Sequence, residues 1–158
     1  MSRISRHKTR EYLFQVLFAK SVTKETFDIT VFNEAFYEAE YLACIDQKYF
    51  EVLFLWVLSK ERELIALIEQ FAPKFDITIM PVANILPVFI AGYEMLFLEG
   101  EKIPEKVSLN EAIELTKTFS DDSARLLVNG ILNAVMQSKN ELHTSFLHLP
   151  PPKFTVFT

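Results

Sequence analysis

Glycine and cysteine are scarce in this chain, which has three glycines and one cysteine among 158 residues. So few glycines disfavour a fold of short strands and tight turns. The single cysteine, Cys44, excludes an internal disulfide and is typical of a reducing compartment, so we expect a cytoplasmic protein. Its simplest role is that of a buried apolar side chain.

The sequence also lacks the motifs of cofactor and metal sites. It contains no Gly-rich phosphate loop or dinucleotide fingerprint, and no Cys/His cluster with the spacing of a zinc site. Asp121 and Asp122 could form a metal or acid–base pair, but capping and the helix dipole explain adjacent acids at a helix start better. We therefore expect no catalytic residue, no metal and no cofactor, and a binding protein rather than an enzyme.

Charged residues are absent from one long segment, Ile77–Tyr93, which has 17 residues. That length is near the lower limit for a helix that spans a membrane. Pro81, Pro87 and Gly92 interrupt the segment, and Pro87 would kink a helix by removing one of its hydrogen bonds. We expect a buried, kinked core helix and no membrane contact; a transmembrane helix is the alternative.

Helices are predicted by apolar periodicity over residues 5–20, 31–43, 49–58 and 64–71. The segment Tyr49–Leu58 is apolar nearly all round, so we expect it to be central, with Trp56 in the core. With a further hairpin near the C-terminus, the pattern predicts an all-α fold.

This predicted hairpin, VSLNEAIELTKTFSDDSARLLVNGILNAVM, covers Val107–Met136. Ser108 and Glu111 have the spacing of a capping box at the start of its first helix. Ser120–Asp122 would end that helix and cap the second. Gly130 lies inside the second helix, where glycine costs about 1 kcal/mol relative to alanine, so we expect close packing there.

After residue 137 the helical pattern fades, and residues 141–158 are expected to form a separate tail. The segment HLPPPKFTVFT, His148–Thr158, has three consecutive prolines and cannot extend a helix. The tail is expected to be either unstructured or laid over the body through Phe154 and Phe157; a proline-rich docking peptide is a further alternative.

Charge is distributed unevenly along the chain. The net charge is −5, which by itself argues against a nucleic-acid-binding protein. The first ten residues nevertheless carry +4 without any acid, from Arg3, Arg6, Lys8 and Arg10. The remaining residues carry −9, with 12 basic against 21 acidic side chains. A basic segment on an acidic body indicates a localised anion-binding patch.

The basic residues also share a face. At about 100° per residue, one sector of the predicted first helix contains Arg3, Arg6, His7 and Arg10, and it continues into Phe14 and Leu17. Guanidinium groups beside aromatic surface suit single-stranded RNA, because Arg binds phosphate and flat side chains stack on bases. A solvated, frayed N-terminus is the alternative.

Two segments resemble the NusB family of bacterial transcription antitermination factors. KVSLNEAIELTKTF and LVNGIL, within Lys106–Leu132, are similar to the family's C-terminal signature, and RHKTREYLFQVLF, Arg6–Phe18, is similar to its basic first helix. The resemblance implies two small helical bundles that form one compact domain over residues 1–140. It also implies binding of single-stranded boxA RNA of ribosomal operons together with the ribosomal protein NusE, within the RNA polymerase antitermination complex. Family members can also form homodimers.

The resemblance and the shared face together give two sets of candidate site residues. The RNA-binding set is Arg3, Arg6, His7, Lys8, Arg10, Ser123 and Leu127. The partner-binding set is Phe14, Phe18 and Asn84. His7 stands where the family usually has Arg, and it would be only partly charged at cytoplasmic pH.

Several positions depart from the family pattern. Leu127, or Leu126 if the register shifts by one residue, stands where a Phe is common, so an aromatic stacking platform is missing. Ser123 replaces a common Asp, and Asn84 aligns with an acidic residue. Two hypotheses follow: an RNA-binding antitermination factor that acts with NusE, and a NusB-like protein-interaction module without sequence-specific RNA binding.

Overall fold

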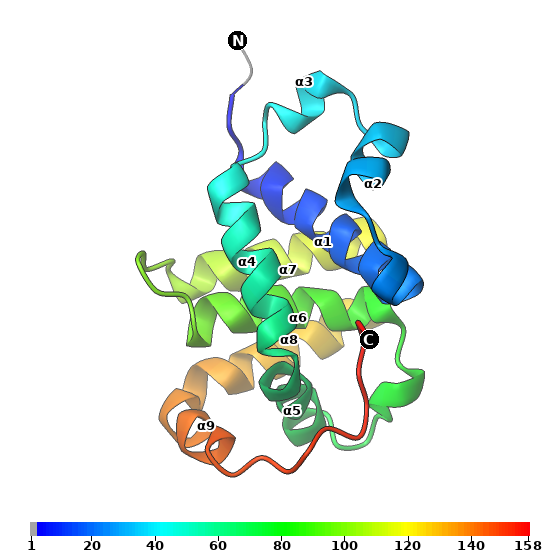
Figure 1. Cartoon of the computed structure of the whole chain (residues 1–158). Coiled ribbons are helices and arrows are strands. Elements are labelled where there is room, and N and C mark those ends of the chain that lie inside the picture. The colour runs from blue at the N-terminus through cyan, green and yellow to red at the C-terminus, as the bar shows by residue number, and fades with distance from the viewer. Residues whose placement is uncertain (1–2) are drawn as a thin grey trace.

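Helix α6 (Val82–Leu96) lies at the centre of the fold in the computed structural model, which describes residues 3–158. Every side chain from Ile85 to Glu94 is buried. The hairpin of α7 (Glu105–Phe119) and α8 (Asp122–Gln137) packs against α6 (Figure 1). The expected buried helix is confirmed, with Pro87 inside it, although it begins only at Val82.

Three further long helices pack around this centre: α1 (Arg6–Thr23), α4 (Gln47–Ser59) and α5 (Glu61–Phe71). The shorter elements are η1 (Lys24–Thr26), α2 (Ile29–Phe36), α3 (Ala39–Leu42), η2 (Ile77–Ile79) and α9 (Lys139–Phe146). Residues 3–158 contain no strand, which confirms the all-α prediction. Within this range no helix has both the length and the apolar character needed to cross a bilayer.

Short polar side chains define where several helices begin. Ser5, Asp28, Asp46 and Asp121 each accept a hydrogen bond from a backbone N–H of the following first turn. Such caps satisfy donors that the helix itself leaves free. The predicted N-cap in the turn before α8 is therefore confirmed at Asp121, which accepts from the N–H of Ala124 at 2.9 Å.

The predicted capping box at the start of α7 is wrong. The helix begins one turn earlier, at Glu105, directly after Pro104, whose fixed φ favours a helix start. Ser108 is therefore inside the helix and buried, and its hydroxyl donates to the carboxylate of Glu94 at 2.7 Å.

The expected close packing at Gly130 is also wrong, because a Cβ there would meet no atom within 4 Å. The glycine at a close approach is Gly92 of α6, where a Cβ would lie 3.0 Å from Leu67 and 3.3 Å from Leu64 of α5.

The side chain of Cys44 was expected to be buried, but it is only partly buried.

The predicted helix over residues 31–43 is broken into α2 and α3. Between them Tyr37 has an extended backbone, and its hydroxyl donates to the side chain of Gln15 in α1. Its ring contacts Tyr12 and Tyr41 at centroid distances of 5.3 and 4.9 Å. The break thus brings an aromatic ring onto α1.

Helix α4 is not central, contrary to its uniformly apolar sequence. Leu53 and Val57 are fully buried, but Leu55 is 63% exposed and Trp56 is 49% exposed. The prediction that Trp56 lies in the core is therefore wrong, because only one face of α4 packs against α1 and α6.

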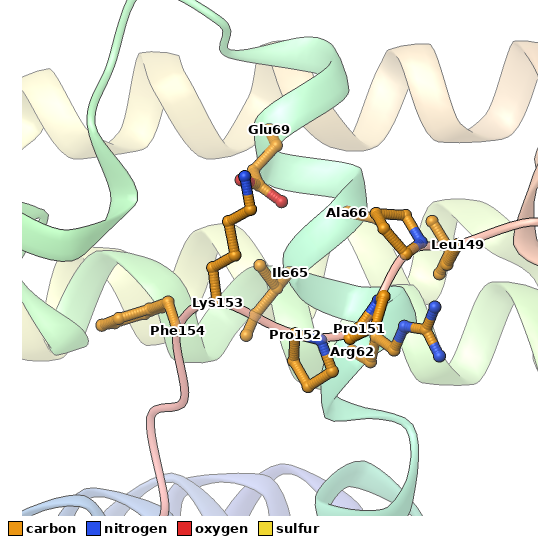
Figure 2. Close-up of a pocket in the computed structure, with 10 residues that line it drawn as sticks. Arg62, Ile65, Ala66, Glu69, Leu149, Pro151, Pro152, Lys153 and Phe154 are labelled. Atoms are coloured by element: carbon orange, nitrogen blue, oxygen red, sulfur yellow. The ribbon is translucent and has the colours of Figure 1, made fainter.

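The C-terminal segment is more ordered than expected. It forms α9 and then crosses α5 as an extended chain, enclosing a small hollow of about 200 Å³ (Figure 2). Val156 and Phe157 are buried, and their backbone N–H groups both donate to the carboxylate of Glu61, at 2.6 and 3.1 Å. Lys24 donates to the carbonyl of Val156 at 2.6 Å. Of the expected alternatives, the structure has the tail lying over the body, with Phe157 buried and Phe154 partly buried against the core, and not an unstructured tail.

A buried polar cluster joins four helices. Arg10 of α1 donates from Nε to Glu94 Oε2 of α6 at 2.9 Å, and from Nη2 to Oε1 at 3.3 Å. Tyr49 of α4 and Ser108 of α7 also donate to this carboxylate. Burial, and then the Glu94 charge, raise the pKa of Tyr49, which keeps its hydroxyl protonated as a donor. The carboxylate is fully satisfied by three neighbouring helices.

Removing Arg10 should destabilise the fold. Arg10→Ala leaves the Glu94 charge buried without its cation, so we expect the free energy of unfolding to fall by about 3–5 kcal/mol. Urea denaturation at pH 7 measures the change. Lys8→Ala, two residues away and exposed, is the control and should stay within about 0.5 kcal/mol of the parent protein. Equal stability of the two variants would contradict this role of the pair.

Removing the ring of Phe157 should also destabilise the protein. Phe157→Ala opens a cavity beside Phe89, whose ring centroid lies 6.2 Å away, so we expect a loss of about 3 kcal/mol. Thermal and urea denaturation measure it, with the exposed Lys153→Ala in the same tail as the control. A loss below about 1 kcal/mol would mean that the tail adds little to the core.

Candidate nucleic-acid and partner interface

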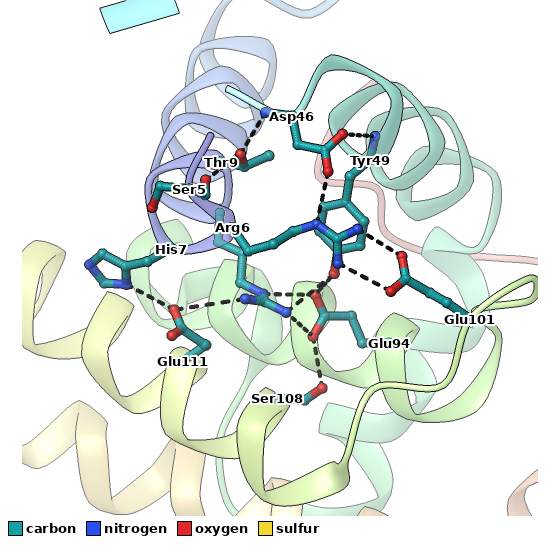
Figure 3. Close-up of polar contacts among 11 residues, drawn as sticks. Ser5, Arg6, His7, Thr9, Asp46, Tyr49, Glu94, Glu101, Ser108 and Glu111 are labelled. Carbon is teal, nitrogen blue, oxygen red and sulfur yellow. Dashed lines mark hydrogen bonds and ion pairs between the residues drawn. The ribbon is translucent and has the colours of Figure 1, made fainter. Parts of the chain in front are cut away.

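Helix α1 packs against α7, and its residues His7 and Arg10 approach Glu111 of α7. Arg6 donates to Asp46 at 3.0 Å and forms two hydrogen bonds with Glu101, at 2.9 and 3.3 Å (Figure 3). Its guanidinium also lies 3.8 Å from the ring centroid of Tyr49. Arg6 is thus held by two carboxylates and an aromatic ring, although its side chain stays 38% exposed.

His7 is paired as well. Its Nδ1 donates to Glu111 of α7 at 2.9 Å, and Glu11 lies 3.6 Å from Nε2. The hydrogen bond to Glu111 raises the pKa of His7 above its ordinary value, and the charges of Glu111 and Glu11 add to the effect. The folded protein therefore holds the imidazolium more firmly than the sequence alone suggested.

Arg10 is not on the surface, so the prediction of an exposed sector that contains it is wrong. Its side chain is 4% exposed and bound to Glu94. Phe14 and Leu17, predicted in the same sector, are buried too. Arg10 is buried because it pairs with Glu94, which lies 84 residues away in the chain. The apolar periodicity of one helix cannot predict such a distant partner. Two basic residues near the N-terminus, Arg3 and Lys8, are exposed. Neither of them forms an ion pair with another residue in the range 3–158.

The hairpin residues Ser123 and Leu127 line a separate hollow of about 490 Å³. It lies between the start of α8, the start of α6 and the loop around η2. We call it the polar hollow; its lining is Lys74, Phe75, Asp76, Ile79, Met80, Pro81, Asn84, Ser123, Ala124 and Leu127. No hydrogen bond or ion pair joins Ser123 or Leu127 to the N-terminal cations within the described residues. The structure therefore divides the predicted RNA-binding set into two places.

The predicted partner-binding residues Phe14 and Phe18 line a second hollow of about 480 Å³. We call it the aromatic hollow; its lining is Phe14, Gln15, Phe18, Ala19, Phe32, Phe36, Tyr37, Ala83 and Phe119. Phe14 forms its floor, stacked on Phe119 at 4.2 Å, while Phe18 is 41% and Phe36 70% exposed. No charged side chain lines this hollow.

The two hollows are neighbours. Ala83 lines the aromatic hollow, and Asn84, the next residue of α6, lines the polar one. Ser120, which follows Phe119, donates to the side-chain oxygen of Asn84. The predicted residue Asn84 thus lies at the junction, which leaves its amide nitrogen free to donate.

Sequence reasoning missed several residues of these hollows. Phe32, Phe36 and Tyr37 come from α2 and the residue after it, and the aromatic richness of this segment was the available signal. Lys74 and Phe75 come from the loop between α5 and η2, which carried no recognised motif. Residues 3–158 include no cluster of acids, histidines and cysteine suited to a metal ion.

Comparison with known proteins identifies relatives over most of the chain. The profile of the NusB family matches residues 7–137. The transcription antitermination protein NusB of Clostridium perfringens (strain 13 / Type A) is 34% identical over 137 residues, covering 85% of this chain and 98% of that protein. The protein of the same name from Lactiplantibacillus plantarum is 32% identical over 137 residues, covering 86% and 97%.

A solved structure supports the fold. T. maritima NusB superposes with a TM-score of 0.70 over 90% of this chain and 99% of that chain, at 22% sequence identity. The agreement extends the all-α description to a NusB-like fold, as the sequence resemblance implied.

The family consists of non-enzymatic antitermination factors, which confirms the prediction that the chain is not an enzyme. The profile match and the sequence identities show that this chain belongs to the NusB family.

Proposed function

We propose that the protein is a transcription antitermination factor that binds boxA-like single-stranded RNA of ribosomal operons together with the ribosomal protein NusE. The names of its relatives support the first part, since they are called transcription antitermination proteins. Its partners would then be the RNA, NusE and the RNA polymerase antitermination complex, all of them in the cytoplasm.

The observation that carries the proposal is the adjacency of two hollows with different chemistry. The aromatic hollow has an uncharged lining with exposed Phe18 and Phe36, which suits an apolar protein surface. The polar hollow is lined largely by apolar side chains, but it also has the charged groups of Lys74 and Asp76, the amide of Asn84 and the hydroxyl of Ser123 beside the Phe75 ring, which suits an unpaired nucleotide. A protein partner and an RNA bound there would meet at Asn84.

The N-terminal cations have a reduced part in this proposal. Arg3 and Lys8 are exposed and available for phosphates, and Arg6 could exchange Glu101 for a phosphate because its side chain is partly exposed. Arg10 is excluded by its burial against Glu94. His7 is paired with Glu111, so in this proposal it would attract RNA through its charge without contacting a phosphate directly.

A protein-interaction module without an RNA role is the second candidate. The pairing of Arg6, His7 and Arg10 with carboxylates favours it, because neutralised cations attract phosphate weakly. In that case NusE, or a second copy of the chain, would bind the aromatic hollow, and no RNA would join.

Titration of boxA-like and scrambled RNA, with and without NusE, separates the two candidates. We expect tighter binding of the boxA-like RNA, a gain on adding NusE, and a slope of log K against log salt of about −2, for roughly three phosphate contacts. Lys8→Ala should make the slope shallower by about 0.7, whereas the exposed Lys153→Ala should not. Equal binding of both RNAs, or a slope near zero, would leave only the protein-interaction module.

The His7–Glu111 pair should make stability depend on pH. Because the folded protein holds the His7 proton more tightly, its contribution is complete below the ordinary pKa of about 6.5. It is lost as the pH rises through the higher pKa of the folded state. His7 is 47% exposed, so we expect at most about 1 kcal/mol. Urea denaturation between pH 5.5 and 8.5 should show this loss in the parent protein and not in His7→Gln; identical profiles would contradict it.

A further inference from the structure

Phe75 presents an exposed aromatic ring on a turn that hydrogen bonds hold in place. The ring side chain is 56% exposed. Its backbone N–H donates to the carbonyl of Ala72 at 3.0 Å. The next residue, Asp76, accepts from both the N–H and the hydroxyl of Thr78, at 2.9 and 2.6 Å. An exposed ring on an ordered turn is prepared for a flat ligand, because little freedom is lost on binding.

Apolar side chains line much of the hollow around the ring, and among them are polar groups that can still form hydrogen bonds. The hydroxyl of Ser123 donates to Asp121 at 2.8 Å, so its oxygen remains able to accept. The side-chain oxygen of Asn84 accepts from Ser120, so its NH₂ group remains able to donate. Lys74 adds one cation to the lining. The carboxylate oxygens Oδ1 of Asp76 and Asp121 are already engaged in capping.

This set of groups matches a nucleobase with its phosphate. A base offers a flat face for stacking, edge donors and acceptors, and a nearby negative charge. An apolar protein side chain would instead leave the NH₂ group of Asn84 without a partner. The neighbouring aromatic hollow, which no charged group lines, suits such a side chain better.

From this geometry we infer that Phe75 stacks on an unpaired base of the bound RNA, with Lys74 at its phosphate and Asn84 and Ser123 at its edge. The inference rests on the proposed RNA-binding function and adds the residue that supplies the stacking surface. Leu127, which lines the same hollow, has no flat face. The ring of Phe75 therefore performs from the η2 loop the role that an aromatic side chain on α8 would have.

Two substitutions at this position test the inference. Phe75→Ala should weaken binding of a boxA-like RNA at least about fivefold, the lower end of the effect of one lost stacking contact. Phe75→Tyr keeps the ring and should bind within about twofold of the parent protein. Trp56→Ala, which removes a 49% exposed ring from α4 outside both hollows, is the matched control and should not change binding of RNA. Fluorescence anisotropy at fixed salt measures all three.

A fluorescence probe distinguishes stacking from a structural effect. Trp56 is the only tryptophan of the chain, and it is half exposed on α4, so Trp56→Phe removes the background emission. In that variant Phe75→Trp places the sole tryptophan in the polar hollow. Adding boxA-like RNA should quench its emission with the same midpoint as the anisotropy change. Adding NusE alone should not.

The outcomes separate this inference from the function on which it rests. Sequence-selective RNA binding in the parent protein, with Phe75→Ala unchanged and no quenching, would overturn the inference and leave the proposed function standing. Quenching by NusE and not by RNA would assign the hollow to the protein partner and also overturn it. No selective RNA binding by the parent protein, with or without NusE, would overturn the proposed function and the inference together.

Discussion

The buried pair of Arg10 and Glu94 fixes how the N-terminal helix sits on the rest of the molecule. Taking two charges out of water is unfavourable by several kcal/mol per ion unless each finds its partners. Here the carboxylate is bonded by Arg10, Tyr49 and Ser108, from α1, α4 and α7. Because the set is satisfied only when these helices meet α6 in one register, it selects a single arrangement rather than merely adding stability.

That constraint also shapes recognition. A basic N-terminal segment would be expected to capture RNA through phosphates, yet two of its guanidiniums and its imidazole are bound by acids of the same chain. The cations of this segment that remain without an ion pair among residues 3–158 are Arg3 and Lys8, on a chain of net charge −5. Because phosphate contacts carry no sequence information, selectivity in the proposed function would come from shape and short-range contacts to the bases. The hollows at the start of α6 are the places that offer both.

Local patterns in the sequence predicted local structure well and long-range pairing poorly. The uncharged segment became the buried α6, and the polar turn became a capped junction of α7 and α8, because burial and capping depend on neighbouring residues. The burial of Arg10 was missed because its partner is 84 residues away. The prediction that Trp56 is buried was wrong because the apolar sequence of a helix does not show how many of its faces pack against other helices. Phe75 gave no signal, since a lone aromatic residue in a loop acquires meaning only from the side chains that the fold brings beside it.

If RNA and a protein partner bind as proposed, the junction at Asn84 gives a physical reason for their binding to be cooperative. A partner in the aromatic hollow would contact Phe119 and Ala83, the residues that precede Ser120 and Asn84 in their helices. Ordering these helix ends would also fix the hydrogen bond between Ser120 and Asn84, and Asn84 lines the polar hollow. The second ligand would then lose less freedom on binding than the first. Because such coupling is reciprocal, the RNA must strengthen the protein contact by the same factor. In the proposed function, the two adjacent sites would thus add affinity to what Arg3 and Lys8, the N-terminal cations without an ion pair among residues 3–158, can supply.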